Sequence, residues 1–280
     1  MNITAKTKLC MVIGDPVENS LSPQIHNAAY EHLGIDSEFV YVSSRVASED
    51  IAAFVAGAKA MGVRGFACKK PHKQAIIDYL DEIDETARKI GAVNTVVNNR
   101  GRLKGYNTDW IGITAPLESI TSLKDKEIAL LGAGGASRAA AYGVINKGAK
   151  LTIYNRTLEK AHQLAEELGC QARSLDDQVP IKSADVIINT TSVGEPLAAN
   201  ETPLPKEFID KGQIVFDIVY GTDDTRLLRE ARQQGAQVIR GTDMLLHQGM
   251  AQFKLFTGRE APEDAMRQAF AVALGYGGRQ

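Results

Sequence analysis

Lys73 and Asp109 are the two residues whose types and positions best suit proton transfer. Lys73 follows Pro71-His72 just after an apolar run, and Asp109 follows Asn107-Thr108 just after another. Both therefore stand at the ends of predicted strands that could converge on one cleft. A lysine tuned by burial and a neighbouring carboxylate can move a proton to or from an oxygen, while the carboxylate orients it. A single lysine is more often a solvated surface charge, so the pair depends on the elements around it.

The neighbouring histidines and serines allow a structural and a functional interpretation. His72 is interpreted as structural, because adjacent side chains do not point the same way in extended or turn backbone. His26, on a predicted helix, suits packing or capping better than ligation. Ser20 and Ser22 flank Leu21 ahead of that helix, and alternation aims both hydroxyls to one side, where they could bind a carboxylate. Simple N-capping by Ser22 is the alternative.

Residues 127–157 have the pattern of a dinucleotide-binding βαβ unit. The apolar strand Glu127–Leu131 runs into a turn of small residues, Gly132, Ala133, Gly134, Gly135 and Ala136. Gly132 permits the tight turn, Gly134 lets backbone N–H groups approach a pyrophosphate, and the next small residues let a helix begin close to the sheet. A glycine-rich turn alone is weak evidence, but here a helix and the strand Lys150–Tyr154 follow, as the motif requires.

The end of this second strand predicts which cofactor is bound. NAD sites usually place a carboxylate there for the ribose 2′-hydroxyl, whereas this chain has Asn155-Arg156-Thr157. A guanidinium can pair bidentately with a 2′-phosphate, which a carboxylate would repel. The residues therefore favour NADP, with Lys160 adding positive charge nearby. The alternative is that Arg156 is simply a solvated loop residue.

A third polar loop follows the apolar strand Val186–Ile188. It reads Asn189-Thr190-Thr191-Ser192-Val193-Gly194. Doubly wound sheets bind ligands where a strand end opens into such a loop. Taken alone, an ordinary Ser/Thr turn explains it equally well.

Composition excludes several classes of protein. The chain has 280 residues, 44% hydrophobic and 24% charged, with a net charge of -2. This charge gives no reason to expect nucleic acid or an anionic membrane as a partner. Three widely spaced cysteines support neither a disulfide framework nor a zinc site. Without an apolar leader or a membrane-spanning run, we expect a cytoplasmic enzyme.

Strand-like and helix-like runs alternate along the chain, which predicts an α/β fold with largely parallel sheets. In the first part, strands are expected at Leu9–Ile13, Glu38–Val42, Gly62–Cys68, Ala92–Asn98 and Arg102–Tyr106. Helices are expected at Pro23–Leu33, Ala47–Met61 and Lys73–Leu80, with helical structure also in the acidic stretch that follows. The last two strands are joined by an Asn99-Arg100-Gly101 turn.

A polar link at Ser119–Lys126 precedes the nucleotide unit, after which strands and helices alternate to about Gly241. We therefore expect an N-terminal α/β substrate domain at 1–113, with a mostly parallel sheet. A Rossmann-type doubly wound domain follows at 114–240. A final amphipathic helix is predicted at Ala261–Leu274.

At this point the residues resemble the shikimate dehydrogenase family, and the matching segments span nearly the whole chain in order. They are Gly14-Asp15-Pro16, Ser20-Leu21-Ser22-Pro23, His26-Asn27, Pro71-His72-Lys73, Gly91-Ala92-Val93-Asn94-Thr95, Asn107-Thr108-Asp109, Gly132–Gly135, Asn155-Arg156-Thr157, Asn189–Gly194, Asp217-Ile218-Val219-Tyr220, Gly241-Thr242-Asp243-Met244-Leu245 and Gln248. No single segment is decisive, but so many in order are highly specific.

The resemblance implies reversible, NADPH-dependent reduction of 3-dehydroshikimate to shikimate, a small cyclic hydroxy acid. Lys73 and Asp109 would form the proton-transfer dyad. Substrate would be held by Ser20, Ser22, Asn94, Gln248 and Tyr220, with Lys69 nearby. NADP would be bound by Gly132, Ala133, Gly134, Gly135, Ala136, Asn155, Arg156, Thr157, Thr190, Ser192, Val219, Gly241 and Met244. It also implies that the helices of about 241–280 pack back on the first domain. The sequence leaves open whether the protein is a monomer or a homodimer.

One segment departs from the family pattern, Gly-x-Asn-Val-Thr-x-Pro-x-Lys. The Asn and Thr positions, which normally face substrate, hold Ala67 and Lys69. Ala67 removes an amide, and Lys69 brings a cation that would disfavour a protonated Lys73 or attract an acidic group. A missing polar partner can strongly alter discrimination between polyols, so the substrate could be a relative of shikimate. Smaller departures are Asn19, Thr222 and Asp243, where His, Pro and Gly are common.

Two alternatives accompany the leading hypothesis. One is a quinate/shikimate-like paralogue acting on another cyclic hydroxy acid. Ala67 and Lys69 favour this alternative. The other is a catalytically silent NADP-binding sensor. The intact Lys73/Asp109 pair argues against a silent protein.

Overall fold

The chain forms two compact units in the computed structural model, which describes residues 3–195, 198–221 and 224–275. The first unit comprises Met1–Thr108 and Gln248–Gln280, and the second comprises Asp109–His247. The first unit is therefore discontinuous in sequence. The expected boundary at 113–114 falls inside the helix Asp109–Glu118, and the one at 240–241 falls at the start of the helix Gly241–Thr257.

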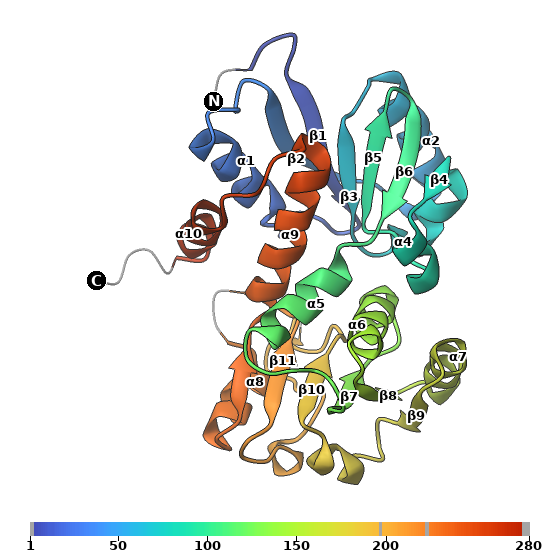
Figure 1. Cartoon of the computed structure of the whole chain (residues 1–280), viewed down its shortest axis with the longest axis vertical. Helices are drawn as coiled ribbons and strands as arrows, with labels where there is room; N and C mark the ends of the chain where they lie inside the picture. Colours follow the sequence, from blue (N-terminus) through green and yellow to red (C-terminus); the bar gives the residue numbers. More distant parts are fainter. Residues whose placement is uncertain (1–2, 196–197, 222–223, 276–280) are drawn as a thin grey trace. The chain divides into compact units, whose positions relative to one another are not determined.

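A mixed six-stranded sheet forms the centre of the first unit (Figure 1). Its strands are β1 (Lys8–Gly14), β2 (Phe39–Arg45), β3 (Gly65–Cys68), β4 (Glu82–Ile83), β5 (Thr95–Asn99) and β6 (Arg102–Tyr106), in the order β2-β1-β3-β5-β6-β4. β5 runs antiparallel to both neighbours, whereas β1 is parallel to β2 and β3, and β4 is parallel to β6. As a result, the ends of β1, β3 and β6 and the start of β5 share one edge.

Helices cover both faces of this sheet. They are α1 (Ser22–His32), α2 (Ile51–Ala60), α3 (His72–Ala75), α4 (Glu85–Ile90), the second half of α9 (Gly241–Thr257) and α10 (Glu263–Ala273). Short 3-10 turns at Ser48–Asp50 and Ile76–Tyr79 adjoin α2 and α3. One apolar core joins α2 and α4 to the sheet side chains of Met11, Phe66 and Val96. On the other face lie α1 and, through Phe256 against Gly65, α9, and α10 packs on α1.

Arg64 anchors the end of α9 to the first unit. Its Nε donates to the Phe256 carbonyl at 2.8 Å, and its Nη1 donates to the Asn98 carbonyl at 3.1 Å. A guanidinium suits the carbonyl groups that a helix leaves unpaired at its C-terminus. Next to it, Gly65 lets α9 approach closely, since a Cβ there would lie 2.5 Å from the Phe256 ring.

The second unit is a six-stranded, wholly parallel sheet with the Rossmann order. Its strands are β7 (Glu127–Leu131), β8 (Lys150–Asn155), β9 (Gln171–Ser174), β10 (Val186–Asn189), β11 (Ile214–Asp217) and β12 (Gln237–Ile239), in the order β12-β11-β10-β7-β8-β9. From β7 the chain adds strands first on one side and then, from β10, on the other. Ligands bind doubly wound sheets where this reversal occurs.

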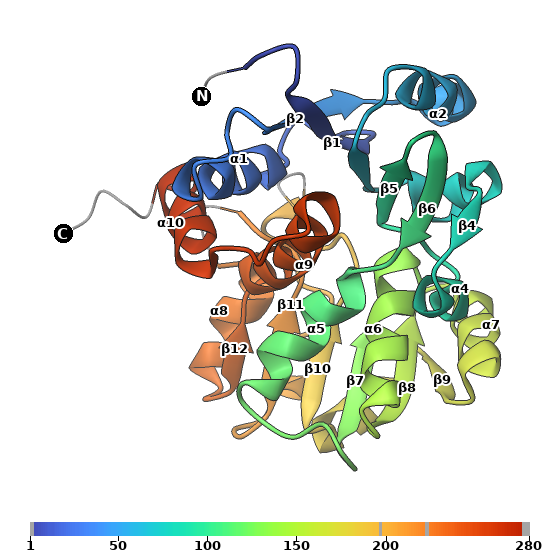
Figure 2. The same cartoon turned by 45° about the horizontal axis from the view of Figure 1, so that its top comes forward.

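The helices of the second unit are α5 (Asp109–Glu118), α6 (Gly135–Asn146), α7 (Leu158–Leu168), α8 (Arg226–Gln233) and the first half of α9. Short 3-10 turns lie at Val179–Ser183 and Lys206–Phe208. Figure 2 shows α5 and α6 side by side over the sheet. Gly143 makes this contact close, because a Cβ there would lie 2.9 Å from the Thr114 methyl group.

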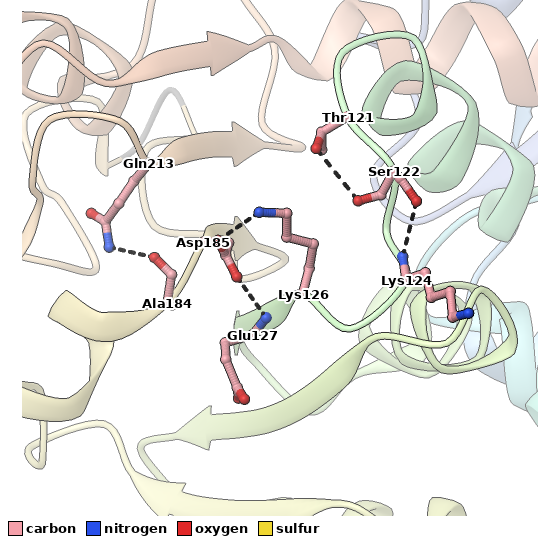
Figure 3. A network of polar contacts seen from close by, with 8 residues as sticks. All are labelled: Thr121, Ser122, Lys124, Lys126, Glu127, Ala184, Asp185 and Gln213. Atoms are coloured by element: carbon pink, nitrogen blue, oxygen red, sulfur yellow. Dashed lines mark hydrogen bonds and ion pairs between the residues drawn. The ribbon is translucent and has the colours of Figure 1, made fainter.

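A polar network closes the amino edge of the second sheet (Figure 3). Lys126 Nζ and the Glu127 N–H both donate to the Asp185 carboxylate, at 2.8 and 2.9 Å. The buried Gln213 amide donates to the Ala184 carbonyl at 2.8 Å and to two further carbonyls, of Ile181 and Lys182. The hydrogen-bond donors and acceptors at this edge bond to one another, so we assign the edge a structural role.

Two local expectations about the first unit were wrong. Ser22 is not the cap of α1: the capping position is Leu21, without a side-chain bond, and Ser22 is already the first helical residue. The helix expected at Lys73–Leu80 is only the four-residue α3 followed by a 3-10 turn. Within the described ranges, no helix has the length and apolarity needed to cross a membrane.

Candidate active site

Gly132, Ser137 and Thr190 pack together where β7 and β10 end. Gly132 has φ +114°, and its N–H donates to the Tyr154 carbonyl at 2.7 Å. A Cβ at Gly132 would lie 2.8 Å from Thr190 Oγ1 and 3.1 Å from Ser137 Oγ, so only glycine fits. Those two hydroxyls bond each other at 2.7 Å, and Thr190 Oγ1 donates to the Leu131 carbonyl at 2.7 Å. The turn after β7 is thereby tied to the loop after β10.

The start of α6 is open for an anion. Gly134 occupies the capping position, and its N–H donates to Ser137 Oγ at 2.9 Å. Apart from its chain neighbours and the backbone of α6, none of the described residues comes within 4 Å of a Cβ built at Gly134, so a ligand can approach this backbone closely. Ala133, Gly135 and Ala136 are half-buried around it. A helix N-terminus with accessible N–H groups and small side chains suits a pyrophosphate.

Arg156 stands exposed just past the end of β8. Asn155 Nδ2 donates to the Thr157 carbonyl at 2.8 Å, which shapes the turn, and Thr157 is the capping position of α7. Among the residues that the structure describes, the Arg156 side chain has no ion-pair or hydrogen-bond partner. Its guanidinium is therefore available to an external anion. Lys160 is exposed one turn later.

A buried carboxylate joins the loops after β10 and β11. Asp217 accepts hydrogen bonds from Asn189 Nδ2 at 2.9 Å, from the Val219 N–H at 3.1 Å and from Thr225 Oγ1 at 2.6 Å. Burial raises the pKa of Asp217 to about 6, although these three donors partly offset the effect. Asp217 therefore holds the loop containing Ser192 and the segment leading to Tyr220 in fixed positions.

Three further predicted cofactor positions lie in the second unit. Val219 is buried beside Asp217. Gly241 begins α9 directly against the Ile218 carbonyl, where a Cβ would collide with it. Met244 belongs to the apolar core of this unit. Their roles toward a cofactor stay predictions.

The shared edge of the first sheet gathers the predicted substrate residues of this unit. Ser20 and Ser22 follow β1, and their hydroxyl oxygens lie 3.3 Å apart, both buried. Lys73 follows β3 within α3, where it is half-buried, and its carbonyl accepts from the Val93 N–H at 2.7 Å. Asn94 precedes β5. The reversed direction of β5 explains why these separate segments meet.

Asn94 is the centre of a buried hydrogen-bond network. Its Oδ1 accepts from the Thr108 N–H and from Thr95 Oγ1, each at 2.8 Å. Its Nδ2 donates to Thr108 Oγ1 at 2.9 Å and lies 3.5 Å from Gln248 Oε1. Gln252, on α9, adds a bond to Thr95 Oγ1 at 2.9 Å. The amide orientation of Asn94 is fixed by these partners.

The predicted dyad residues lie on different units. Lys73 belongs to the first unit, whereas Asp109 is the first residue of the second and begins α5, buried. Their pairing stays a prediction. His72 is buried with Nε2 2.7 Å from the Val46 carbonyl, which agrees with a structural role.

Ala67 and Lys69 lie where the sequence departs from the family pattern. Ala67 is buried in β3 and directly opposite Thr95 of β5. Lys69 is half-buried, and its N–H donates to the Ile13 carbonyl at 2.8 Å. The structure therefore places an apolar methyl group beside the Asn94 network.

Sequence reasoning missed Thr95, Thr108, Ser137 and Gln252. Thr95 and Thr108 stand within two of the family segments without an assigned role, and Ser137 is the third residue of a recognised helix, so their positions could have been inferred. Gln252 carried only one signal, its spacing of one helical turn from Gln248.

Taken together, the fold and these loops define an α/β protein with a Rossmann-type dinucleotide-binding unit and a separate polar site. Three family profiles match the chain in order. The Shikimate dehydrogenase substrate binding domain matches residues 12–96, Shikimate / quinate 5-dehydrogenase matches 116–222, and the Shikimate 5'-dehydrogenase C-terminal domain matches 241–269. The chain belongs to the shikimate dehydrogenase family.

Relatives and solved structures agree over nearly the full length. A Bacillus cereus shikimate dehydrogenase (NADP(+)) is 43% identical, covering 94% of this chain and 98% of its own. A shikimate dehydrogenase crystallised with NADP+ is 40% identical, with a TM-score of 0.92 and 98% of both chains covered. The Thermus thermophilus enzyme with NADP(H) and shikimate is 35% identical, with a TM-score of 0.88, covering 95% of this chain and 100% of its own. The predicted family and fold class are confirmed.

Proposed function

We propose that this protein is an NADP-dependent shikimate dehydrogenase, which interconverts 3-dehydroshikimate and shikimate. One observation carries the proposal: the segments holding Ser20, Ser22, Lys73 and Asn94 follow β1 and β3 or precede β5, at one edge of the first sheet, in a chain 43% identical to an enzyme of that name. Each of these residue types suits a cyclic hydroxy acid, since hydroxyls, an amide and an ammonium bind a carboxylate and ring hydroxyls.

The cofactor residues fit NADP for reasons visible in their surroundings. Gly132 and Gly134 leave room for backbone to approach a pyrophosphate, and α6 directs its N-terminal N–H groups there. Arg156, exposed and without a protein partner in the described ranges, would pair with the 2′-phosphate. When bound, the reduced nicotinamide supplies the hydride.

The chain's own residues would handle the proton. Lys73 would hold a proton at Nζ and deliver it to the carbonyl oxygen of the substrate, taking it back in the reverse direction. Asp109 would orient the ammonium and stabilise its charge. Ser20 and Ser22 would hold the substrate carboxylate, while Asn94 and Gln248 would hold ring hydroxyls.

Ala67 and Lys69 favour a second candidate, a paralogue that prefers another cyclic hydroxy acid. The methyl group of Ala67 offers no hydrogen bond, and Lys69 adds a cation in the segment leading to Lys73. A site with a changed polar set discriminates between substrates that differ in one group.

The test is a substrate panel measured with NADPH and with NADH. It includes 3-dehydroshikimate, 3-dehydroquinate and amino analogues, run on the wild type and on Lys73→Ala. We expect turnover of 3-dehydroshikimate with NADPH, and a loss of kcat of about 100-fold or more in Lys73→Ala. Lys70→Ala, which changes an exposed lysine of the same loop, is the control. Unchanged activity in Lys73→Ala would refute the dyad, and faster turnover of another substrate would favour the paralogue.

A further inference from the structure

Asp217 is a fully buried carboxylate at the end of β11, and three segments donate hydrogen bonds to it. Its Oδ1 accepts from Asn189 Nδ2 at 2.9 Å and from the Val219 N–H at 3.1 Å. Its Oδ2 accepts from Thr225 Oγ1 at 2.6 Å. A charge can be buried only where such bonds replace its water, and bonds to a charged acceptor are the stronger ones. One residue therefore joins the ends of β10 and β11 to the start of α8.

The carboxylate fixes the orientation of the Asn189 amide. A carboxylate only accepts, so Asn189 must turn its Nδ2 toward Asp217 and its Oδ1 away. That Oδ1 accepts from the Thr191 N–H at 3.0 Å and from Thr191 Oγ1 at 2.7 Å. The ionised form of Asp217 thereby sets the shape of the turn that opens the loop 189–194.

The same turn carries Thr190, which is bonded to the start of the second unit's first crossover. Its Oγ1 donates to the Leu131 carbonyl at 2.7 Å and lies 2.7 Å from Ser137 Oγ. Ser137 Oγ in turn accepts from the Gly134 N–H at 2.9 Å. A change in the Asn189 amide would therefore be transmitted to the backbone to which we assign the pyrophosphate.

Asp217 acts on a second loop through Val219 and Thr225. Thr225 is the capping residue of α8, and its Oγ1 accepts from the Leu228 N–H at 3.4 Å while it donates to Asp217. Gly194 lies against this contact, since a Cβ built there would be 3.5 Å from the Thr225 methyl group and 3.9 Å from Val219. The end of the loop 189–194 and the start of α8 are thus packed on each other beside Asp217.

We propose that Asp217 is a positioning residue for cofactor binding, whose ionised carboxylate holds the loops containing Thr190, Ser192 and Val219 in the arrangement that NADP requires. The proposal rests on the proposed function, because these are loops assigned to the cofactor there. A protonated carboxyl becomes a donor at one oxygen and loses one of its three bonds. Proton binding at Asp217 and cofactor binding therefore oppose each other, each weakening the other by the same factor.

The pH range of this competition is experimentally accessible, because burial raises the pKa of Asp217 to about 6. Other titratable side chains that are not exposed lie on the described segments around the end of β11, namely Glu195, Tyr220, Asp224, Glu230, Asp243 and His247. Ion pairs join Asp224 to Arg240 and Glu230 to Arg226. A variant that changes only Asp217 separates its titration from theirs.

The test is calorimetric titration of NADP+, without substrate, into wild type and Asp217→Asn from pH 5 to pH 8. Asparagine keeps an acceptor for Asn189 and Val219 and removes the charge, so it imitates the protonated residue at every pH. At pH 8 the Kd for NADP+ should be about tenfold higher in the variant, because its acceptor makes weaker hydrogen bonds. At pH 5 the ratio should shrink to about twofold, because binding to the wild type must then remove a proton from Asp217.

Proton release gives a second readout of the same titrations. Below pH 6, NADP+ should release more protons from wild type than from Asp217→Asn, as measured in buffers of different ionisation enthalpy. The 2′-phosphate of NADP+ is common to both proteins, so its own titration cancels in the comparison. NAD+, which lacks this phosphate, serves as a further probe.

Asp185→Asn is the matched control. Asp185 also accepts from a backbone N–H and from a side chain of this unit, but at the amino edge of the sheet (Figure 3). The control should lower stability and leave the Kd for NADP+ unchanged at every pH. Thr225→Val removes one donor to Asp217 and keeps the methyl group beside Gly194. It should also weaken NADP+ binding at pH 8, and it serves if Asp217→Asn does not fold.

Three results would overturn the proposal. One is an equal Kd for wild type and Asp217→Asn at pH 8. Another is a ratio that stays constant from pH 5 to pH 8, which would make Asp217 merely structural. The third is tighter binding to wild type at pH 5 than at pH 8, absent from the variant, because the carboxylate would then mainly repel the phosphates. If wild type does not bind NADP+ at any pH, the proposed function fails instead, so the two failures are distinguishable.

Discussion

At the scale of single residues, Arg156 is the residue that we propose selects the cofactor. Its guanidinium is exposed at the end of β8, where an NAD site usually has a carboxylate. Replacing it by alanine should raise the KM for NADPH about 10- to 100-fold, because a charge-assisted hydrogen bond to phosphate is worth about 1.5–3 kcal/mol. The KM for NADH should hardly change. Steady-state kinetics with both cofactors provides the measurement.

Arg173→Ala is the control for this prediction. Arg173 lies on the neighbouring strand β9 and pairs with Asp177 at 2.6 Å, so its removal also deletes one exposed guanidinium. Its KM values should match those of wild type. Equal losses in the two variants, or equal use of both cofactors by wild type, would contradict a 2′-phosphate contact.

Asp217 is a second residue with a measurable consequence. In the folded protein, burial raises its pKa from the ordinary value of 3.8 to about 6. The folded state then binds more protons than the unfolded state between these values. The free energy of unfolding should therefore decrease as pH rises from about 4 to about 6, by up to about 3 kcal/mol from this residue.

Urea denaturation of wild type and Asp217→Asn at pH 4, 5, 6 and 7 measures this contribution. The variant lacks the titrating group, so the difference in unfolding free energy between the two proteins should change over this interval and become constant above it. Other titrating groups cancel in the comparison. Parallel curves for the two proteins would show that Asp217 keeps an ordinary pKa.

At the scale of elements, the β7–α6 turn depends on one glycine. Gly132→Ala places a Cβ at φ +114° and 2.8 Å from Thr190 Oγ1. It should destabilise the protein by at least the 1–2 kcal/mol (roughly) of left-handed backbone strain. Displacement of the loop after β10 should also raise the KM for NADPH tenfold or more (about 1.4 kcal/mol).

Gly169→Ala separates strain from collision. Gly169 ends α7 at φ +69°, and among the described residues only its chain neighbours lie within 4 Å of a Cβ built there. This control should lose about 1 kcal/mol of stability and keep the KM for NADPH. A similar KM change in both variants would mean that the Thr190 contact is unimportant.

The elements themselves were predictable where their pattern is local. The strand Glu127–Leu131 and the Asn99-Arg100-Gly101 turn appear as expected, because alternation, apolar runs and turn residues act over a few positions. The helix expected at Lys73–Leu80 is shorter, and Ser22 is helical rather than a cap. Both errors concern helix ends, which depend on the packing around them.

At the scale of the whole molecule, the last helix, α10, contacts the first helix, α1. α10 packs on α1, with Phe270 5% exposed and Val272 67% exposed on the same helix. Phe270→Ala should lower the free energy of unfolding by about 3–5 kcal/mol, because it opens a cavity in the core. Val272→Ala should change it by less than about 0.5 kcal/mol. Chemical denaturation gives both values, and equal effects would show that α10 does not stabilise the first unit.

By itself, the sequence determined the βαβ unit, its glycine turn and the position of the arginine that we propose selects the cofactor. These features lie within about 30 consecutive residues, and short-range rules are sufficient to predict them. Only the tertiary structure decided which residues surround the shared edge of the first sheet. The reversed strand β5 brings Asn94 to the ends of β1, β3 and β6, and the return of α9 brings Gln252 onto Thr95, opposite Ala67. Strand register and helix docking couple residues far apart in the chain, so no local pattern contains them.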